Sequence, residues 1–215
     1  MSGPAFVVTG TDTGIGKTVF AAGLAGALGA HYWKPIQAGV DPEGDSETVA
    51  TLSGLPAERI LREAFRLRTP ASPHLAARID GVDIGLSDLT VPIVDDPLVI
   101  EGAGGVLVPI SETLLMADLF AHWGLPIILC ARTALGTINH SLMSIEALRS
   151  RGAPVAAIAF IGDPHPENER IIPALGQLPS LGRLPLLDPL DAAGLASAFA
   201  VQIDLSALRA HATNP

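Results

Sequence analysis

Short aliphatic runs alternate along the chain with longer stretches rich in alanine and leucine. Within the runs, polar and apolar positions do not alternate, which is typical of strands buried on both faces of a parallel sheet. The longer stretches have the length and composition of helices. The predicted strands cover residues 5–8, 31–36, 98–100, 127–131, 155–161 and 182–184.

This order of strands and helices predicts a repeated βαβ unit and therefore an α/β fold. Right-handed crossovers place the carboxyl ends of all strands at one edge of the sheet, where ligands bind. The segment 41–96 is less regular and contains several prolines and glycines, so we expect an irregular insertion of helices and loops over the site. No repeat or linker marks a second domain, and residues 1–215 are predicted to form one.

The composition narrows the classes of partner. Hydrophobic residues make up 48% of the chain and charged residues 16%, but there are only six Phe, two Trp and one Tyr, which favours an aliphatic core. The net charge of -9 disfavours nucleic acid and anionic membranes. The single cysteine, Cys130, cannot form an internal disulfide, and neither a membrane-spanning stretch nor a signal peptide is apparent. We expect a cytoplasmic protein.

The strongest motif is the segment 10–18, GTDTGIGKT, which lies between a predicted strand and a predicted helix. In such a turn, successive N–H groups converge on phosphate oxygens, Lys17 reaches the β- and γ-phosphates, and the Thr18 hydroxyl can bind Mg²⁺. The spacing is a variant of the P-loop pattern because Thr11 occupies the first glycine position. The motif predicts a P-loop NTPase-like, three-layer α/β/α fold with a mainly parallel central sheet. The alternative is a glycine-rich turn with an incidental lysine.

Two charged residues besides Lys17 fit a phosphate site, namely Lys34 and Glu101. Lys17 and Lys34 are the only lysines beside eleven arginines, and both lie in turns that follow apolar runs. An ammonium group on a flexible stem suits a moving phosphoryl group, although nucleotide bias alone would also make lysine scarce. Glu101 follows the apolar run 97–100 and is the predicted carboxylate partner of a metal ion. Read alone, a glutamate that ends a strand before glycines is more often a turn residue, and its pairing with the P-loop reverses this reading.

The motifs GTDTGIGKT, KPIQAG, DSETV, IEGAGG and LGTINH, in this order, resemble the dethiobiotin synthetase family over residues from about 5 to about 189. The resemblance implies a P-loop α/β homodimer that uses ATP and Mg²⁺. Its reaction closes the ureido ring of dethiobiotin from 7,8-diaminononanoate and CO₂. One amine forms a carbamate, the carbamate attacks the γ-phosphate to give a mixed anhydride, and the second amine closes the ring.

The resemblance also assigns residues to roles. Lys17 and Lys34 would be catalytic. The nucleotide would contact Gly14, Ile15, Gly16, Lys17, Thr18, Val19, Glu47, Glu101, Gly102, Ala103, Gly104, Pro185, Leu186 and Leu187. The diamine substrate would contact Thr13, Lys34, Ala38, Gly136, Thr137, Ile138 and Asn139, the last four of which form a predicted helix N-terminus at the dimer interface. Magnesium would be held by Thr18, Glu47 and Glu101.

Three positions depart from the family pattern. The family usually has Ser-Asp where this chain has Ser46-Glu47, so the second metal carboxylate is Glu47 or the adjacent Asp45, and Glu47 is preferred. Ala38 stands where a Ser or Thr often contacts the substrate, which would lower substrate affinity. Ile161 and Gly162 stand where many members carry an adenine-reading Asn, which leaves the preferred nucleotide open.

Other classes of function are weighed against this one. A partitioning ATPase of the deviant P-loop group would carry a lysine at residue 12, where this chain has Asp12. An amide-forming ligase related to cobyrinate synthetases would need a glutaminase portion, which is missing. A nucleotide-binding module without activity is compatible with Ala38. The six histidines show no ligand spacing, and His74, in an SPH segment, is either structural or near the substrate.

Overall fold

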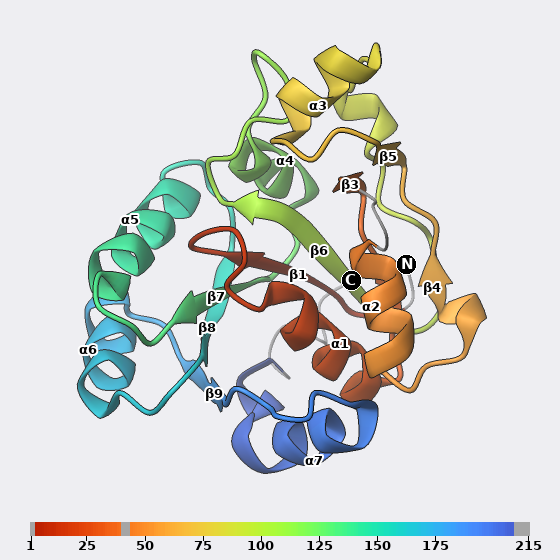
Figure 1. The fold of residues 1–215 in the computed structure, drawn as a ribbon. Coiled ribbons are helices and arrows are strands. Elements are labelled where there is room, and N and C mark those ends of the chain that lie inside the picture. The colour runs from red at the N-terminus through yellow and green to blue at the C-terminus, as the bar shows by residue number, and fades with distance from the viewer. Residues whose placement is uncertain (1–2, 40–43, 209–215) are drawn as a thin grey trace.

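The computed structural model describes residues 3–39 and 44–208, and its centre is a parallel sheet of seven strands (Figure 1). The strand order is β4-β2-β6-β1-β7-β8-β9, and every neighbouring pair is parallel. The strands are β1 (Ala5–Gly10), β2 (His31–Trp33), β4 (Ile60–Leu61), β6 (Leu98–Gly105), β7 (Ile127–Arg132), β8 (Val155–Ile161) and β9 (Ser180–Leu184). The predicted parallel α/β fold is confirmed.

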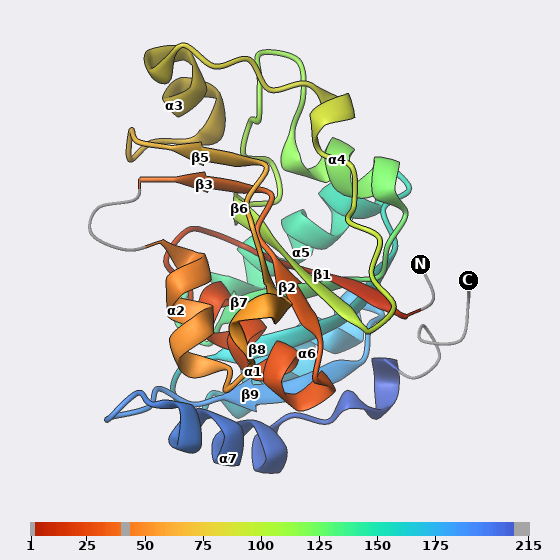
Figure 2. The ribbon, with the colours of Figure 1, turned by 90° about the vertical axis from the view of Figure 1, so that its right-hand side faces the viewer.

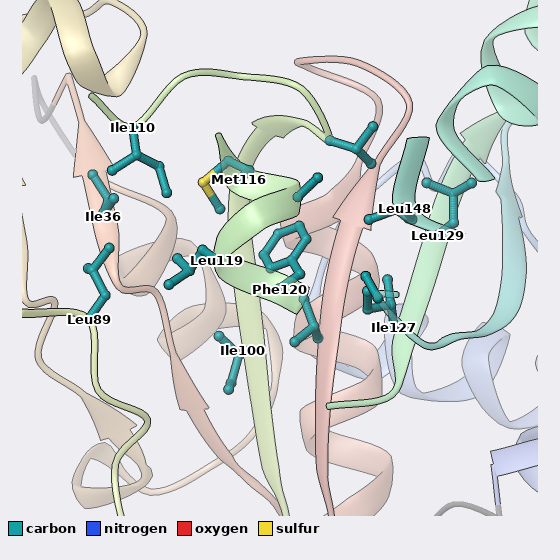
Figure 3. Packing of buried hydrophobic residues seen from close by; sticks show 14 of the residues in the cluster. Ile36, Leu89, Ile100, Ile110, Met116, Leu119, Phe120, Ile127, Leu129 and Leu148 are labelled. Atoms are coloured by element: carbon teal, nitrogen blue, oxygen red, sulfur yellow. The ribbon is translucent and has the colours of Figure 1, made fainter. Parts of the chain in front are cut away.

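Helices cover both faces of the sheet and create two apolar cores. Side chains of β1 illustrate the division, since Val7 belongs to one core while Phe6 and Val8 belong to the other. The first core lies under α3 (Pro73–Asp80), α4 (Met116–Trp123), α5 (Thr137–Arg149) and α6 (Pro166–Gly176), and the second lies under α1 (Lys17–Leu28), α2 (Asp45–Leu52) and α7 (Ala192–Gln202). Figure 3 shows Met116, Leu119 and Phe120 of α4 packed over the first face. The result is three layers, α/β/α.

Close approach of α1 and α7 depends on a glycine. A Cβ atom on Gly23 would lie 2.3 Å from the ring of Phe199 in α7, so only glycine leaves room for this ring. The same ring packs against Phe20 with centroids 5.3 Å apart. This packing holds α1, the helix that follows the glycine-rich loop, in a fixed position against the sheet.

The predicted strand 31–36 is in fact two strands. β2 ends at Trp33, and β3 (Ile36–Ala38) begins after Pro35, which has no N–H group to continue the ladder. β3 pairs with β5 (Phe65–Leu67) in a separate two-stranded parallel sheet, visible beside α3 in Figure 2. The turn between β2 and β3 places Lys34 at the carboxyl edge of the main sheet.

The segment 44–96 contains strands that its composition did not predict. Besides α2 and α3 it supplies β4, which joins the edge of the main sheet, and β5. Three short 3₁₀ helices complete the description: Ala57–Arg59, Leu86–Asp88 and Leu205–Leu208. Within residues 3–39 and 44–208, no helix has the length and apolar character needed to cross a bilayer.

Candidate active site

The glycine-rich loop connects β1 to α1 at the carboxyl edge of the sheet. Gly14 and Gly16 have φ values of 67° and 95°, a left-handed conformation that favours glycine. A Cβ atom on Gly10 would lie 2.5 Å from the Ile15 side chain and 2.9 Å from the Lys17 side chain, so glycine at this position lets both side chains pack closely against the loop. No side chain caps the N-terminus of α1, which leaves its first N–H groups available to an anion.

Lys17 follows this loop as the first residue of α1 and is only 6% exposed. Its Nζ atom donates a hydrogen bond to the backbone oxygen of Asp12, 2.8 Å away. Burial lowers the pKa of Lys17, and the nearby carboxylate of Glu101 opposes this effect. The ammonium group is therefore poorly compensated in the bare protein, and an anion bound at the loop would stabilise it.

Glu101 forms the centre of a buried polar cluster on the side of the sheet that faces α1. Its side chain is 1% exposed. One carboxylate oxygen, Oε1, accepts hydrogen bonds from Thr18 Oγ1 at 2.8 Å and from Lys34 Nζ at 3.1 Å. The other, Oε2, accepts a hydrogen bond from the Tyr32 hydroxyl at 2.7 Å. The neighbouring strands β2 and β6 and the first turn of α1 thus contribute to one site, and the strand that carries Glu101 continues to Gly105 rather than ending there.

Lys34 connects this cluster to the first turn of α2. Its Nζ atom forms ion pairs with both Glu101 and Asp45. Burial disfavours the ammonium form, but these two carboxylates together raise the pKa of Lys34, so it carries its charge at neutral pH. Burial and the adjacent Glu101 carboxylate also raise the pKa of Tyr32, so its hydroxyl remains a donor.

The two carboxylates in the first turn of α2 have different partners. Asp45 contacts Lys34, as described above. Glu47 accepts a hydrogen bond from the Gly44 N–H at 2.9 Å and another from Arg66 Nη2 at 2.6 Å. The structure therefore engages both oxygens of Glu47 away from Lys34 and places Asp45 beside it.

The donor set of this cluster suits a hard divalent cation. Thr18, Glu101 and Asp45 offer hydroxyl and carboxylate oxygens, which Mg²⁺ prefers. Among the described residues, no group of three or more His, Cys, Asp or Glu side chains could hold a metal ion alone. Mg²⁺ is usually bound through one or two carboxylates with substrate phosphates and water, so these residues fit a metal that arrives with a nucleotide.

A cavity of about 520 Å³ extends from the P-loop along the ends of β7, β8 and β9. Both backbone groups of Gly162 are already used there, because its N–H donates to the Leu184 oxygen and its oxygen accepts from Arg183. Most of the wall is apolar. The predicted nucleotide residues Gly14, Ile15, Gly16, Val19, Pro185, Leu186 and Leu187 all line this cavity.

A second cavity, of about 440 Å³, lies on the other side of the loop tip and is lined by Thr13, residues 105–109 and the α5 residues His140 and Met143. Gly104 adjoins it in sequence, and a Cβ there would lie 2.8 Å from Val108. The predicted start of a helix near Gly136 is confirmed, since α5 begins at Thr137.

The remaining predicted substrate residues are not gathered in that cavity. Thr137 is buried, and its hydroxyl donates to the Arg132 oxygen at 2.5 Å. Gly136, Ile138 and Asn139 are exposed, and Ala38 lies in β3, away from the lining. Of the other predicted residues, Gly102 and Ala103 continue β6 directly after Glu101.

Sequence reasoning missed one member of the cluster. Tyr32 is the only tyrosine in the chain and precedes Lys34 by two residues, which places both on the same face of an extended segment. That spacing was the available signal. The contact itself joins residues 69 positions apart, and it depends on the pairing of β2 with β6.

The parallel sheet, the glycine-rich loop and the buried lysine that begins α1 define a P-loop α/β nucleotide-binding protein. A solved structure with a similar fold is a ParA family ATPase from Chlorobium tepidum, with a TM-score of 0.52 over 92% of this chain and 91% of that one. The two sequences are 13% identical, so the likeness concerns the fold alone. A family model described as an AAA domain matches residues 5–194.

Curated relatives specify the family further. Proteins named ATP-dependent dethiobiotin synthetase from Rhodopseudomonas palustris and Nitrobacter hamburgensis are 65% and 63% identical to this chain. The matches cover 91% and 90% of this chain and 94% and 92% of those proteins. A third, from Agrobacterium fabrum, is 60% identical over 94% of this chain and 95% of its own length. The chain belongs to the ATP-dependent dethiobiotin synthetase family.

Proposed function

We propose that this protein closes the ureido ring of dethiobiotin from 7,8-diaminononanoate and CO₂, with ATP and Mg²⁺. The observation that carries the proposal is the convergence of Thr18 and Lys34 on one buried carboxylate, Glu101, beside the P-loop lysine. Phosphoryl transfer needs positioned charge more than a protein nucleophile. Cys130, the single thiol, is buried, and burial raises its pKa, which agrees with a reaction without a cysteine nucleophile.

The P-loop residues bind and orient the phosphates in this proposal. The uncapped N-terminus of α1 supplies N–H groups to the β- and γ-phosphates. Lys17 exchanges its hydrogen bond to the Asp12 oxygen for one to a phosphate oxygen. This exchange replaces a neutral acceptor with an anionic one and offsets the burial of the ammonium group.

Lys34 neutralises charge on the transferred phosphoryl group and orients the carbamate oxygen that attacks it. Its position between Glu101 and Asp45 keeps the ammonium charged before the substrates bind. Magnesium, when bound, supplies further neutralisation of the phosphate oxygens. Thr18 and Glu101 would hold it, and of the two candidate carboxylates in α2 the contacts favour Asp45 over Glu47.

The diamine would occupy the cavity beside the loop tip, where Thr13 lies between it and the phosphates. We propose that a second copy of the chain completes this site. The segment Gly136, Ile138 and Asn139 faces solvent at the uncapped start of α5, and the neighbouring side chains of Leu135 and Met143 are apolar and exposed. The uncapped N-terminus of a helix attracts anions, so the start of α5 would bind the carboxylate of a substrate held in the partner protomer.

The nucleotide base would lie in the larger cavity, against Pro185, Leu186 and Leu187. Because the backbone groups of Gly162 are already paired, we propose weak discrimination between ATP and other nucleotides. The remaining expectations also stay proposals: one domain over residues 1–215, a cytoplasmic location, and no nucleic acid or membrane partner.

The test is phosphate release from Mg-ATP and bicarbonate, with and without 7,8-diaminononanoate, together with detection of dethiobiotin by mass. We expect release that depends on the diamine and matches product one to one. Hydrolysis that ignores the diamine, or no turnover, would contradict the proposal and favour a switch ATPase or an inactive nucleotide-binding module.

A further inference from the structure

Tyr32 contacts the cluster through the Glu101 oxygen that neither Thr18 nor Lys34 contacts. Its side chain is completely buried in β2, and its hydroxyl donates to Glu101 Oε2 at 2.7 Å. The contacts from Thr18 and Lys34 both go to the opposite oxygen, Oε1. The two oxygens of Glu101 are thus divided between a donor from the core and two donors from the site.

This division restricts the orientation of the carboxylate. A carboxylate bonded through Oε1 alone can rotate about its terminal torsion, which is soft for glutamate. The Tyr32 hydroxyl removes this freedom because the phenol ring is packed in the core and cannot follow. Mg²⁺ requires near-ideal octahedral geometry, and partners behind a ligand generally set its orientation.

We propose that Tyr32 is a positioning residue for the magnesium–nucleotide site. Its hydroxyl anchors Oε2 of Glu101, so that Oε1 is the oxygen presented to Thr18, to Lys34 and to the incoming metal–phosphate complex. The residue acts through Glu101 and does not touch the substrates. This inference rests on the proposed function, since it assumes that Glu101 serves a magnesium-bound nucleotide.

The variant Tyr32→Phe removes only the hydroxyl and keeps the ring in the core. We expect the Mg²⁺ concentration for half-maximal binding of a fluorescent ADP analogue to rise by about tenfold, the effect typical of losing a partner behind a metal ligand. In steady-state assays, the same shift should appear in the Mg²⁺ dependence, with an unchanged KM for the diamine. An unchanged Mg²⁺ midpoint would overturn the inference.

Trp33→Phe is the matched control. Trp33 follows Tyr32 in β2 but packs in the core on the opposite face, and its Nε1 donates to the Arg62 oxygen at 3.1 Å. Both variants lose one buried hydrogen-bond donor from the same strand. A purely structural role for Tyr32 would make both variants less stable and leave both Mg²⁺ midpoints unchanged.

A double-mutant cycle with Glu101→Gln tests the route of the effect. If Tyr32 acts through Glu101, Tyr32→Phe should shift the Mg²⁺ midpoint much less in the Gln background. Equal shifts in both backgrounds would overturn the inference. Failure of the proposed function is distinguishable, because the wild-type protein would then form no dethiobiotin from the diamine, whereas failure of this inference leaves wild-type product formation intact and only the Mg²⁺ midpoint of Tyr32→Phe unchanged.

Discussion

Two groups of charged side chains meet at the first turn of α2, where Asp45 contacts one and Glu47 belongs to the other, and they differ mainly in their exposure to water. The buried cluster consists of Lys34, Glu101 and the hydroxyls around them, and its two charged side chains are 5% and 1% exposed. The exposed cluster is the Arg66–Glu47 pair, whose side chains are 41% and 38% exposed, and Arg66 also contacts the largely buried Glu63. Both contain short contacts, so distance alone does not separate them.

The difference teaches that burial decides what a charge contributes. Water and salt screen the exposed pair, so its expected contribution to stability is at most about 1 kcal/mol. In the buried cluster each charge has lost hydration, and removing one partner leaves another uncompensated. In the proposed reaction, the same desolvation would strengthen its interaction with a transferring phosphoryl group. The following changes test this contrast.

Glu101→Gln should have the largest effect. The amide keeps the volume but removes the charge that balances Lys34 and that would face the metal. We expect turnover to fall by about 1000-fold, equivalent to several kcal/mol of lost transition-state stabilisation. Single-turnover phosphate release measures this loss. Retention of more than a tenth of the wild-type rate would show that the cluster is structural.

Lys34→Met and Lys17→Met should each lower turnover by about 100-fold, less than Glu101→Gln, but should separate in stability. Lys34 has a raised pKa, so its charge stabilises the folded state at every pH below its unfolded pKa, and this contribution is lost only as pH rises through the folded value. Lys17 has a pKa lowered by burial, so its charge opposes folding at neutral pH.

We therefore expect Lys34→Met to lower Tm by about 6 to 12 °C, corresponding to about 3 kcal/mol. Lys17→Met should change Tm by less than about 2 °C or raise it slightly. Calorimetry without nucleotide, at pH 7 and pH 9, measures the Tm change of each variant. The Tm change caused by Lys34→Met should be the same at both pH values. Equal losses in the two variants would contradict the assignment of opposite pKa shifts.

Asp45→Asn and Glu47→Gln compare the two clusters directly, since both residues belong to the first turn of α2. We expect the Mg²⁺ concentration for half-maximal turnover to rise by about tenfold for Asp45→Asn and by less than about twofold for Glu47→Gln. The reversed order would restore Glu47, the residue preferred from sequence, as the metal carboxylate.

Arg66→Ala should have the smallest effect. Partial burial favours the protonated carboxyl of Glu47, but Arg66 and the Gly44 N–H together lower the pKa of Glu47. The pair therefore stabilises the fold above the unfolded pKa, and the contribution is lost as pH falls through the folded value. Urea titrations should show a loss below about 1 kcal/mol at pH 7 that shrinks below about pH 4. A loss that persists in acid would indicate packing by the Arg66 stem instead.

Much of the site could be predicted because its signals are local in sequence. The glycines of residues 10–16 specify a loop that few other residues can form, and Lys17 and Thr18 follow within it. Glu101 was recognisable from the apolar strand before it. The placement of Lys34 at the phosphate site followed in outline from the alternation of strands and helices, since carboxyl ends of parallel strands share one edge.

Only the tertiary structure decided which side chains from different strands and helices contact one another. Whether Asp45 or Glu47 faces Lys34 depends on how α2 docks. Both residues carry a carboxylate in the same turn of the helix, so the sequence alone does not distinguish them. The strands β4 and β5 are too short to produce a periodic signal, and they form only because β2 and β3 offer free edges. Tyr32 joined the cluster through the register of β2 against β6. Local residue order therefore determined the loop and its chemistry, whereas packing between distant segments determined which carboxylate each charge meets, because hydrogen bonds and desolvation depend on position in space.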